Sequence, residues 1–119
     1  MTEVTSAEFQ KLEAAAMTEE VLLASVLQAA REFRWRTAHF RPARTERGWR
    51  TPVQGDGKGW PDLVLVRGDR LMFRELKREK ARVRPEQAEW LAILVDAGAD
   101  VGVWKPSGWL DGSILKELL

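Results

Sequence analysis

The chain contains no cysteine, no tyrosine and a single histidine, His39. Without cysteine, a disulfide framework, a thiolate zinc site and a cysteine nucleophile are excluded. One histidine excludes a multi-histidine metal cluster within one chain, and the absence of tyrosine excludes a tyrosine nucleophile. No apolar run approaches the roughly 20 residues that cross a membrane. The N-terminal segment, with Glu3 and Glu8, lacks the basic-then-apolar pattern of a signal peptide. The sequence therefore predicts a cytoplasmic protein.

The residues that are present indicate one globular domain covering 1–119, because the chain is 45% hydrophobic and 31% charged. The formal net charge of +1 conceals segregated charges. Segments 31–50 and 67–84 each carry a net +5, whereas 1–30 and 85–119 each carry −4. Most charged runs are solvated faces. Here arginine dominates and aromatic residues interleave with it, which favours a phosphate-binding surface.

The pattern of apolar, turn and capping residues predicts an alternation of helices and strands. The helices are expected over 5–16, 18–33 and 85–97, with a short C-terminal helix over 107–119; the strands over 36–40, 63–67, 71–77 and 101–104; and a long loop, rich in proline and glycine, over 41–60. The last strand follows a helical crossover, so it should lie parallel to a neighbour. The expected fold is a small α/β domain with a mixed sheet.

Apolar residues at helical or strand spacing are interpreted as core. In the helix over 18–33 these are Leu22, Leu23, Val26, Ala29, Ala30 and Phe33, and in the later elements they are Val64, Val66, Trp90, Leu91, Leu94 and Val101. Trp60 is interpreted as a packing residue rather than a base-stacking one.

Two carboxylates are expected to face each other on a β-hairpin. If Gly68 and Asp69 form a two-residue hairpin loop, the strands pair so that Asp62 falls opposite Glu75, with β-carbons about 5 Å apart. Side chains alternate along a strand, so Lys77 shares a face with Glu75. Two opposed carboxylates destabilise a sheet unless something neutralises them.

A hard divalent cation would neutralise this pair, and oxygen ligands suit Mg²⁺ or Mn²⁺. Such a cation lowers the pKa of water and stabilises charge that develops on a phosphate, while the nearby lysine can orient or help to deprotonate the attacking water. Each feature alone has an ordinary structural explanation. A Pro-Asp pair can begin a strand, and Glu75 and Lys77 can form an exposed ion pair. Together they indicate a metal-dependent phosphodiesterase centre.

Three segments resemble the VRR-NUC family of the PD-(D/E)xK nuclease superfamily. They are Gly59–Val66, Phe73–Lys77 and Pro85–Leu91. The resemblance implies a restriction-endonuclease-like αβββαβ core over 18–106, with an N-terminal helical extension over 1–17 and a C-terminal helix over 107–119.

The resemblance also implies roles for individual residues. The metal ligands would be Asp62, Glu75 and the carbonyl of Leu76, with Lys77 as the catalytic lysine and Gln87 near the site. The family places a glutamate in its first helix. We assign it to Glu19, which continues the apolar helix face, with Glu20 as the alternative.

Basic residues near the expected site are interpreted as DNA contacts rather than catalytic groups. These are His39, Arg41, Arg44, Arg50, Arg78, Lys80, Arg82 and Arg84. For His39 a structural role is the alternative. Asp56 is better explained by a loop Asx-turn than by a further metal ligand.

By resemblance, the activity is expected to be that of a Mg²⁺- or Mn²⁺-dependent endonuclease acting on branched DNA such as Holliday junctions. Family members include phage and bacterial nucleases and DNA-repair domains, so a bacterial or phage-infected cell is the expected setting. A homodimer is implied. The helix over 5–16 is a candidate interface, and simple packing on its own domain is the alternative. No small-molecule cofactor is expected. The alternatives are a nicking, flap or restriction-like nuclease, and a DNA-binding module without catalysis.

Overall fold

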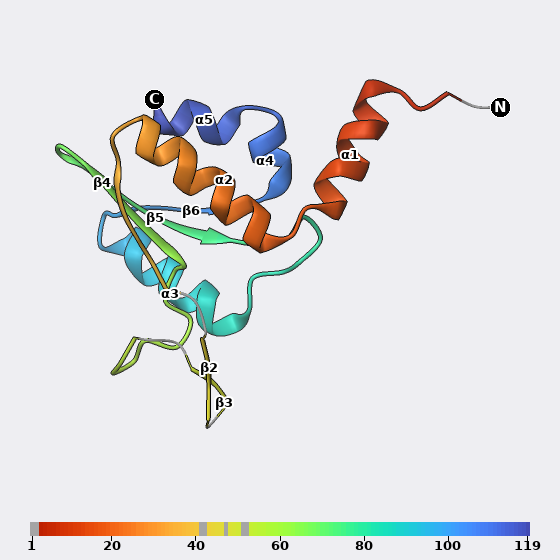
Figure 1. The fold of residues 1–119 in the computed structure, drawn as a ribbon. Coiled ribbons are helices and arrows are strands. Elements are labelled where there is room, and N and C mark those ends of the chain that lie inside the picture. Colours follow the sequence, from red (N-terminus) through yellow and green to blue (C-terminus); the bar gives the residue numbers. More distant parts are fainter. Residues whose placement is uncertain (1–2, 41–42, 47, 51–52) are drawn as a thin grey trace.

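The computed structural model describes residues 3–40, 43–46, 48–50 and 53–119. The elements in chain order are α1 (Ser6–Ala16), α2 (Glu19–Glu32), β1 (Arg36–His39), β2 (Ala43–Thr45), β3 (Gly48–Arg50), β4 (Leu63–Arg67), β5 (Arg70–Leu76), α3 (Pro85–Asp96), β6 (Asp100–Trp104), α4 (Pro106–Leu110) and α5 (Ser113–Leu118). The sheet order is β1-β4-β5-β6. Helices α2, α4 and α5 cover one face of this sheet, and α3 lies on the other (Figure 1). The expected αβββαβ core is confirmed.

Two threonines set where the first helices begin. The side-chain oxygen of Thr5 accepts a hydrogen bond from the backbone N–H of Glu8 at 3.1 Å, and that of Thr18 accepts from Val21 at 3.2 Å. Each bond satisfies one of the free N–H groups at a helix start. The apolar face predicted for α2 is buried, except that Phe33 is only partly so.

The sheet has the register that the hairpin loop predicts. Strands β4 and β5 pair antiparallel with Arg67 opposite Arg70 and Leu63 opposite Arg74. Strand β6 pairs parallel with β5, as the crossover requires. Strand β1 pairs antiparallel with β4 and ends with His39 opposite Leu63. The carboxyl end of β1 therefore lies beside the start of β4.

The prediction that Val64 and Val66 of β4 are core residues is wrong by one position along the strand. Leu63 and Leu65 are fully buried, whereas Val66 is 42% exposed. Val64 is half-buried, as are Trp90, Leu91, Leu94 and Val101. The physical reason is coverage: Leu63 and Leu65 face α2 and its neighbours, whereas the opposite face of the sheet is covered by α3 and by Trp60. The run Leu-Val-Leu-Val is apolar throughout, so it carries no alternation that would have shown this.

The segment expected as a long loop contains a second sheet. Strands β2 and β3 form a two-stranded antiparallel hairpin, with Arg44 opposite Trp49 and Thr45 opposite Gly48. Gly48 has φ of +97°, a conformation that glycine adopts readily. The hairpin and α1 project from the body (Figure 1). The radius of gyration is accordingly 15.7 Å, whereas a compact domain of this length has about 13.5 Å.

The single C-terminal helix expected over 107–119 is two helices, α4 and α5. Gly112 separates them with φ of +84°, a left-handed conformation that cannot continue a right-handed helix. No helix in the described part of the chain is both long and apolar enough to span a membrane.

Three arginines of segment 67–84 hold the C-terminal helix rather than face solvent. Arg67 donates to the carbonyl oxygens of Leu118 at 3.0 Å and Leu119 at 2.8 Å, and Arg70 donates to that of Glu117 at 2.9 Å. These carbonyls lie at a helix C-terminus, where cations are favourable. Arg74 is 3% exposed and binds the carboxylates of Glu117 and an aspartate of β6. The expected phosphate-binding surface therefore does not include these three arginines.

Candidate active site

The two predicted carboxylates meet at one end of the β4–β5 hairpin. Asp62 stands one residue before β4, and continuing the observed register places it opposite Glu75. A side-chain oxygen of Asp62, Oδ2, accepts a hydrogen bond from the backbone N–H of Leu76 at 2.9 Å. The backbone N–H of Phe40 donates to the carbonyl oxygen of Asp62 at 2.7 Å. Asp62 is therefore held by the strands on both sides of β4.

Gln87 fixes the orientation of the second carboxylate. Its Nε2 donates to Oε1 of Glu75 at 3.2 Å, and its own Oε1 accepts from the backbone N–H of Arg84 at 2.9 Å. Gln87 is 5% exposed and Glu75 1%. The second bond also caps the start of α3. The Gln87 side chain thus satisfies the backbone N–H of the N-cap residue of α3, as the N3 residue of a capping box does.

The charge of Glu75 is poorly accommodated by the protein alone. Its Oε2 is buried without a hydrogen-bond partner among the described residues. Burial, followed by the contact with Asp62, raises the pKa of Glu75 to about 9. Glu19 raises this pKa further and Lys77 lowers it. At neutral pH the carboxyl either keeps its proton or needs a cation beside it.

Lys77 lies next to this carboxyl pair and is itself 8% exposed. Its backbone N–H donates to the carbonyl oxygen of Trp104 at 3.1 Å, which ties the end of β5 to β6. Alternation along β5 puts its side chain on the same face as Glu75. A buried ammonium here supplies positive charge beside two carboxylates, and this is the arrangement that a nucleophilic water near a phosphate needs.

The donor set fits a hard divalent cation. Two carboxylates come together, and one carboxylate oxygen, Oε2 of Glu75, is buried and unpaired. Within residues 3–40, 43–46, 48–50 and 53–119, no three His, Asp or Glu side chains gather as a ligand cluster. Mg²⁺ commonly uses only one or two protein carboxylates and keeps several waters. Asp62 and Glu75, with the Leu76 carbonyl, are thus sufficient as candidate ligands.

Of the two glutamates proposed in the first core helix, only Glu19 influences the site. It is half-buried and its charge raises the pKa of Glu75, whereas Glu20 is exposed. Its role as a metal ligand stays a prediction. His39 is exposed at the end of β1, one position from Asp62 in the antiparallel register.

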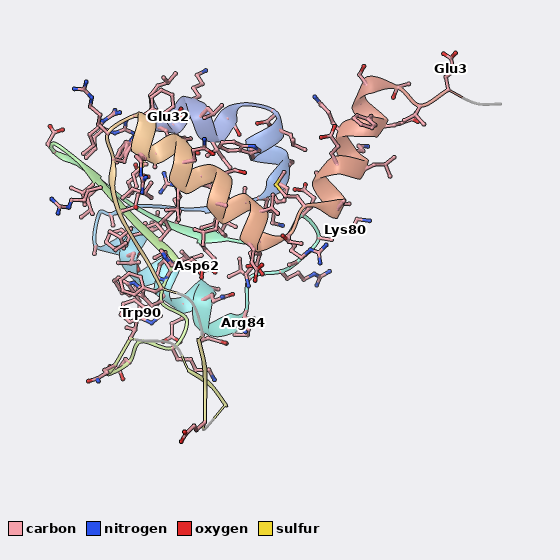
Figure 2. All side chains as sticks on the ribbon, in the orientation of Figure 1. Glu3, Glu32, Asp62, Lys80, Arg84 and Trp90 are labelled. Carbon is pink, nitrogen blue, oxygen red and sulfur yellow. The ribbon has the colours of Figure 1, made fainter. Side chains whose placement is uncertain are left out.

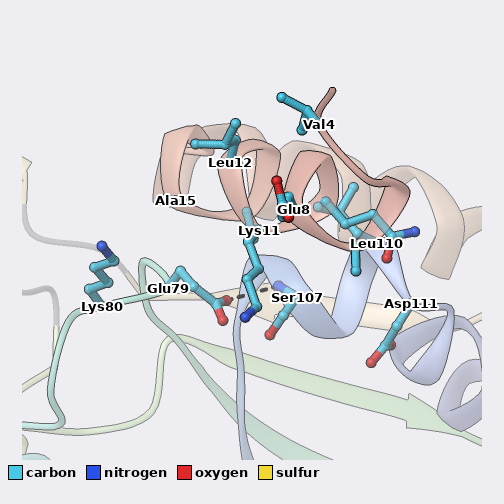
Figure 3. A pocket seen from close by; sticks show the side chains of 13 residues that line it. Val4, Glu8, Lys11, Leu12, Ala15, Glu79, Lys80, Ser107, Leu110 and Asp111 are labelled. Carbon is cyan, nitrogen blue, oxygen red and sulfur yellow. Dashed lines mark hydrogen bonds between the residues drawn. The ribbon is translucent and has the colours of Figure 1, made fainter. Parts of the chain in front are cut away.

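A cleft of about 890 Å³ lies elsewhere, beneath α1. It is formed between α1 and α4 and is edged by Glu79 and Lys80 (Figure 3). Neither Asp62 nor Glu75 lines it. The carboxyl pair of Asp62 and Glu75 and this cleft are therefore separate features of the molecule.

A comparison with protein families decides the identity of this fold. The model of the VRR-NUC domain matches residues 10–107. This range includes every element from α2 to β6, and with them Asp62, Glu75, Lys77 and Gln87. The chain belongs to the VRR-NUC family. This is a family of PD-(D/E)xK-type nucleases, so the chain has the activity of a nuclease, a hydrolase acting on DNA. Comparisons with curated proteins and with solved structures give no match.

Gly59 supports the candidate site of this VRR-NUC protein. The sequence indicates this glycine only as part of the family motif. Gly59 has φ of +87°, and a β-carbon there would lie 2.4 Å from the carbonyl oxygen of Glu86 and 2.9 Å from the nitrogen of Gln87. The loop before Asp62 therefore packs directly on the first turn of α3. In the sequence, the position of Gly59 next to the Trp-Pro-Asp segment is the one indication of this role. The contact with α3 joins segments that are distant in sequence, so no local pattern shows it.

We expect Gly59→Ala to lower the free energy of unfolding by about 2–3 kcal/mol, because a methyl group adds backbone strain and a clash. It should also slow DNA cleavage, since the clash displaces Gln87 from Glu75. Denaturant titration and a cleavage assay measure both effects. The matched control is Gly68→Ala, since Gly68 also has positive φ, +60°, but nothing within 4 Å. Equal losses in the two variants would mean that packing against α3 does not matter.

An aromatic cluster supports the same loop. The Trp60 ring makes edge-on contacts with Phe40, Phe73 and Trp90, at centroid distances of 6.2, 5.7 and 5.0 Å. Trp90 also donates from Nε1 to the carbonyl oxygen of Asp56 at 3.0 Å. Three ring contacts support the interpretation of Trp60 as a packing residue.

Apart from His39, the predicted DNA contacts of this VRR-NUC protein fall in two groups. Arg41 lies outside the described residues, and Arg44 and Arg50 fall in β2 and β3, where the structure describes the backbone alone. The other four lie between β5 and α3 and are all exposed: Arg78, Lys80, Arg82 and Arg84. Figure 2 shows Lys80 and Arg84 along this connection, with Asp62 on the sheet side of α3.

Proposed function

We propose that this VRR-NUC protein is a Mg²⁺- or Mn²⁺-dependent, structure-selective DNA endonuclease that acts on branched duplexes such as four-way junctions. The observation that carries the proposal is the half-buried Asp62 beside the buried Glu75 and Lys77, with Oε2 of Glu75 left unpaired among the described residues. A module that only binds DNA gains nothing from bringing two carboxylates together with one of them buried, and it bears the cost of their repulsion.

The reaction is hydrolysis of a phosphodiester bond. The oxygen of water forms a bond to phosphorus, and the bond from phosphorus to the leaving sugar oxygen breaks. Water gives up one proton and the leaving oxygen takes one up, so the products are a phosphate monoester and a sugar hydroxyl. A divalent cation held by Asp62, Glu75 and the Leu76 carbonyl would lower the pKa of water and stabilise charge on the phosphate. Lys77 orients the attacking water, and Gln87 keeps Glu75 turned toward the site.

A homodimer is part of the proposal, because a four-way junction is resolved by cuts in two strands and each chain offers one carboxyl pair. Helix α1 supports it. Phe9 is 58% exposed and Leu12 62%, and both lie away from Ala14, which is the buried residue of this helix. A second copy of α1 would cover these side chains.

The test is cleavage of an end-labelled four-way junction beside a linear duplex of the same sequence, in Mg²⁺, Mn²⁺ and chelator. We expect metal-dependent cuts in the junction only, with two protomers bound per junction by light scattering. Equal cutting of both DNAs would leave a nuclease without junction selectivity, of the nicking, flap or restriction-like kind. Binding without cleavage in every metal would overturn the catalytic assignment.

A further inference from the structure

The connection between β5 and α3 alternates in exposure. We call residues 78–84 the connector. Its exposed side chains are all basic, namely Arg78, Lys80, Arg82 and Arg84, and its half-buried ones are Glu79, Ala81 and Val83. A run of charge without this alternation would be an ordinary solvated loop. Here the non-basic residues turn inward, so the connector presents one continuous basic edge.

The shape of the connector is set by its inward residues and its ends. A side-chain oxygen of Glu79 accepts from the backbone N–H of Ser107 at 2.9 Å, and its carbonyl accepts from Nζ of Lys105 at 3.2 Å. At its two ends the connector joins the site directly: Lys77 precedes it, and the N–H of Arg84 donates to Gln87. One exposed cation adds to this framework, because Nη2 of Arg78 donates to the carbonyl oxygen of Ala15 in α1 at 3.5 Å.

The positive charges of the connector are largely uncompensated. Its single acid, Glu79, is engaged by the backbone of Ser107. Among the described residues the ion pair found on the connector joins Arg84 to Glu86 at 3.3 Å. Arg78, Lys80 and Arg82 have no such partner within that part of the chain. Like charges placed close together repel, and a regular polyanion relieves this repulsion.

We propose that the connector binds the backbone of the DNA strand beside the scissile phosphate, with Arg78, Lys80 and Arg82 contacting successive phosphates. The proposal rests on the proposed function for the position of the scissile phosphate. The connector supplies affinity and holds the strand in register with Lys77 and Gln87. It carries no base-specific information, because contacts to phosphate position the protein and contacts to base edges specify the sequence.

The test is the salt dependence of DNA binding in chelator, where no cleavage occurs. The variant carries Arg78→Gln, Lys80→Gln and Arg82→Gln. Each phosphate contact contributes about 0.9 to the slope of log K against log salt, so the slope should become shallower by about 2–3. Lys80→Gln alone should change it by about 1. A charge-conserving variant, Arg78→Lys, Lys80→Arg and Arg82→Lys, should keep the wild-type slope.

The matched control removes three exposed arginines of segment 31–50 that are not among the predicted DNA contacts and that lie between the end of α2 and the start of β1: Arg31→Gln, Arg34→Gln and Arg36→Gln. Arg36 pairs with Val66, at the end of β4 remote from Asp62. The control should leave the slope unchanged. An equal change in control and connector variants would mean that total charge alone matters, and an unchanged slope in the connector variants would also overturn the proposal.

The outcome is separable from that of the proposed function. If the slopes of log K against log salt change as expected but the protein cuts no DNA in any metal, the connector proposal stands and the catalytic assignment is wrong. A protein that cuts DNA, but whose connector variants keep the wild-type slope, remains a nuclease that holds its substrate elsewhere.

Discussion

Lys77→Ala is expected to slow DNA cleavage by about 10²–10⁴-fold, the range associated with losing one group that handles a proton. The affinity for DNA should stay within about threefold. Lys77 is 8% exposed, so it offers little surface for a phosphate contact, whereas its charge lies beside Glu75. Single-turnover rates with saturating protein separate the chemical step from binding.

Two further variants serve as controls for the Lys77→Ala prediction. Lys77→Met keeps most of the side-chain volume and should be equally slow, which shows that the loss is not one of packing. Lys116→Ala removes an exposed lysine of α5 and should cleave at the wild-type rate. If Lys77→Ala lost binding and cleavage in equal proportion, Lys77 would be an ordinary phosphate contact rather than a group that acts in the chemical step.

Glu75→Gln is expected to abolish cleavage and yet to stabilise the protein in chelator, by at least about 2 kcal/mol at pH 8. The glutamate is 1% exposed with an unpaired Oε2, so its ionised form is costly without a cation. The amide carries no charge next to Asp62. Wild-type protein should gain thermal stability from Mg²⁺ or Mn²⁺, and Glu75→Gln should gain little, because one ligand is weakened.

The pH dependence of stability in chelator follows from the same group. The pKa of Glu75 rises from its ordinary value of 4.5 to about 9 in the folded chain. The stability that the neutral carboxyl contributes is therefore fully present below pH 4.5 and is lost as the pH rises through about 9. The free energy of unfolding should decline more steeply between these values in wild type than in Glu75→Gln.

Thermal unfolding scans with and without metal test both expectations, and Glu89→Gln is the control. Glu89 is an exposed glutamate of α3, so its replacement should change neither the stability in chelator nor the effect of metal. A loss of stability in Glu75→Gln would show that the carboxylate is well accommodated by the protein itself. No stabilisation of wild type by either cation would overturn the assignment of Asp62 and Glu75 as ligands.

The sequence predicted the centre of the site well, because that part of the fold is local. A two-residue loop of Gly68 and Asp69 sets the register of its hairpin, and the register brings Asp62 opposite Glu75. The hydrogen bond from Gln87 to Glu75 could not be predicted in this way, since it crosses from α3 to the sheet. The resemblance to the family placed Gln87 near the site, and the geometry shows that it also caps its own helix.

The order of the core elements, the family and the position of the carboxyl pair were determined by the sequence alone, through caps, turns and strand periodicity that act over a few residues. The tertiary structure decided the rest. Leu63 and Leu65 rather than Val66 are buried because α2 covers only one face of the sheet. Arg67 and Arg70 hold the C-terminal carbonyls rather than phosphate because α5 lies beside them. Such contacts join segments that are distant in sequence, and no local pattern encodes which of them will meet.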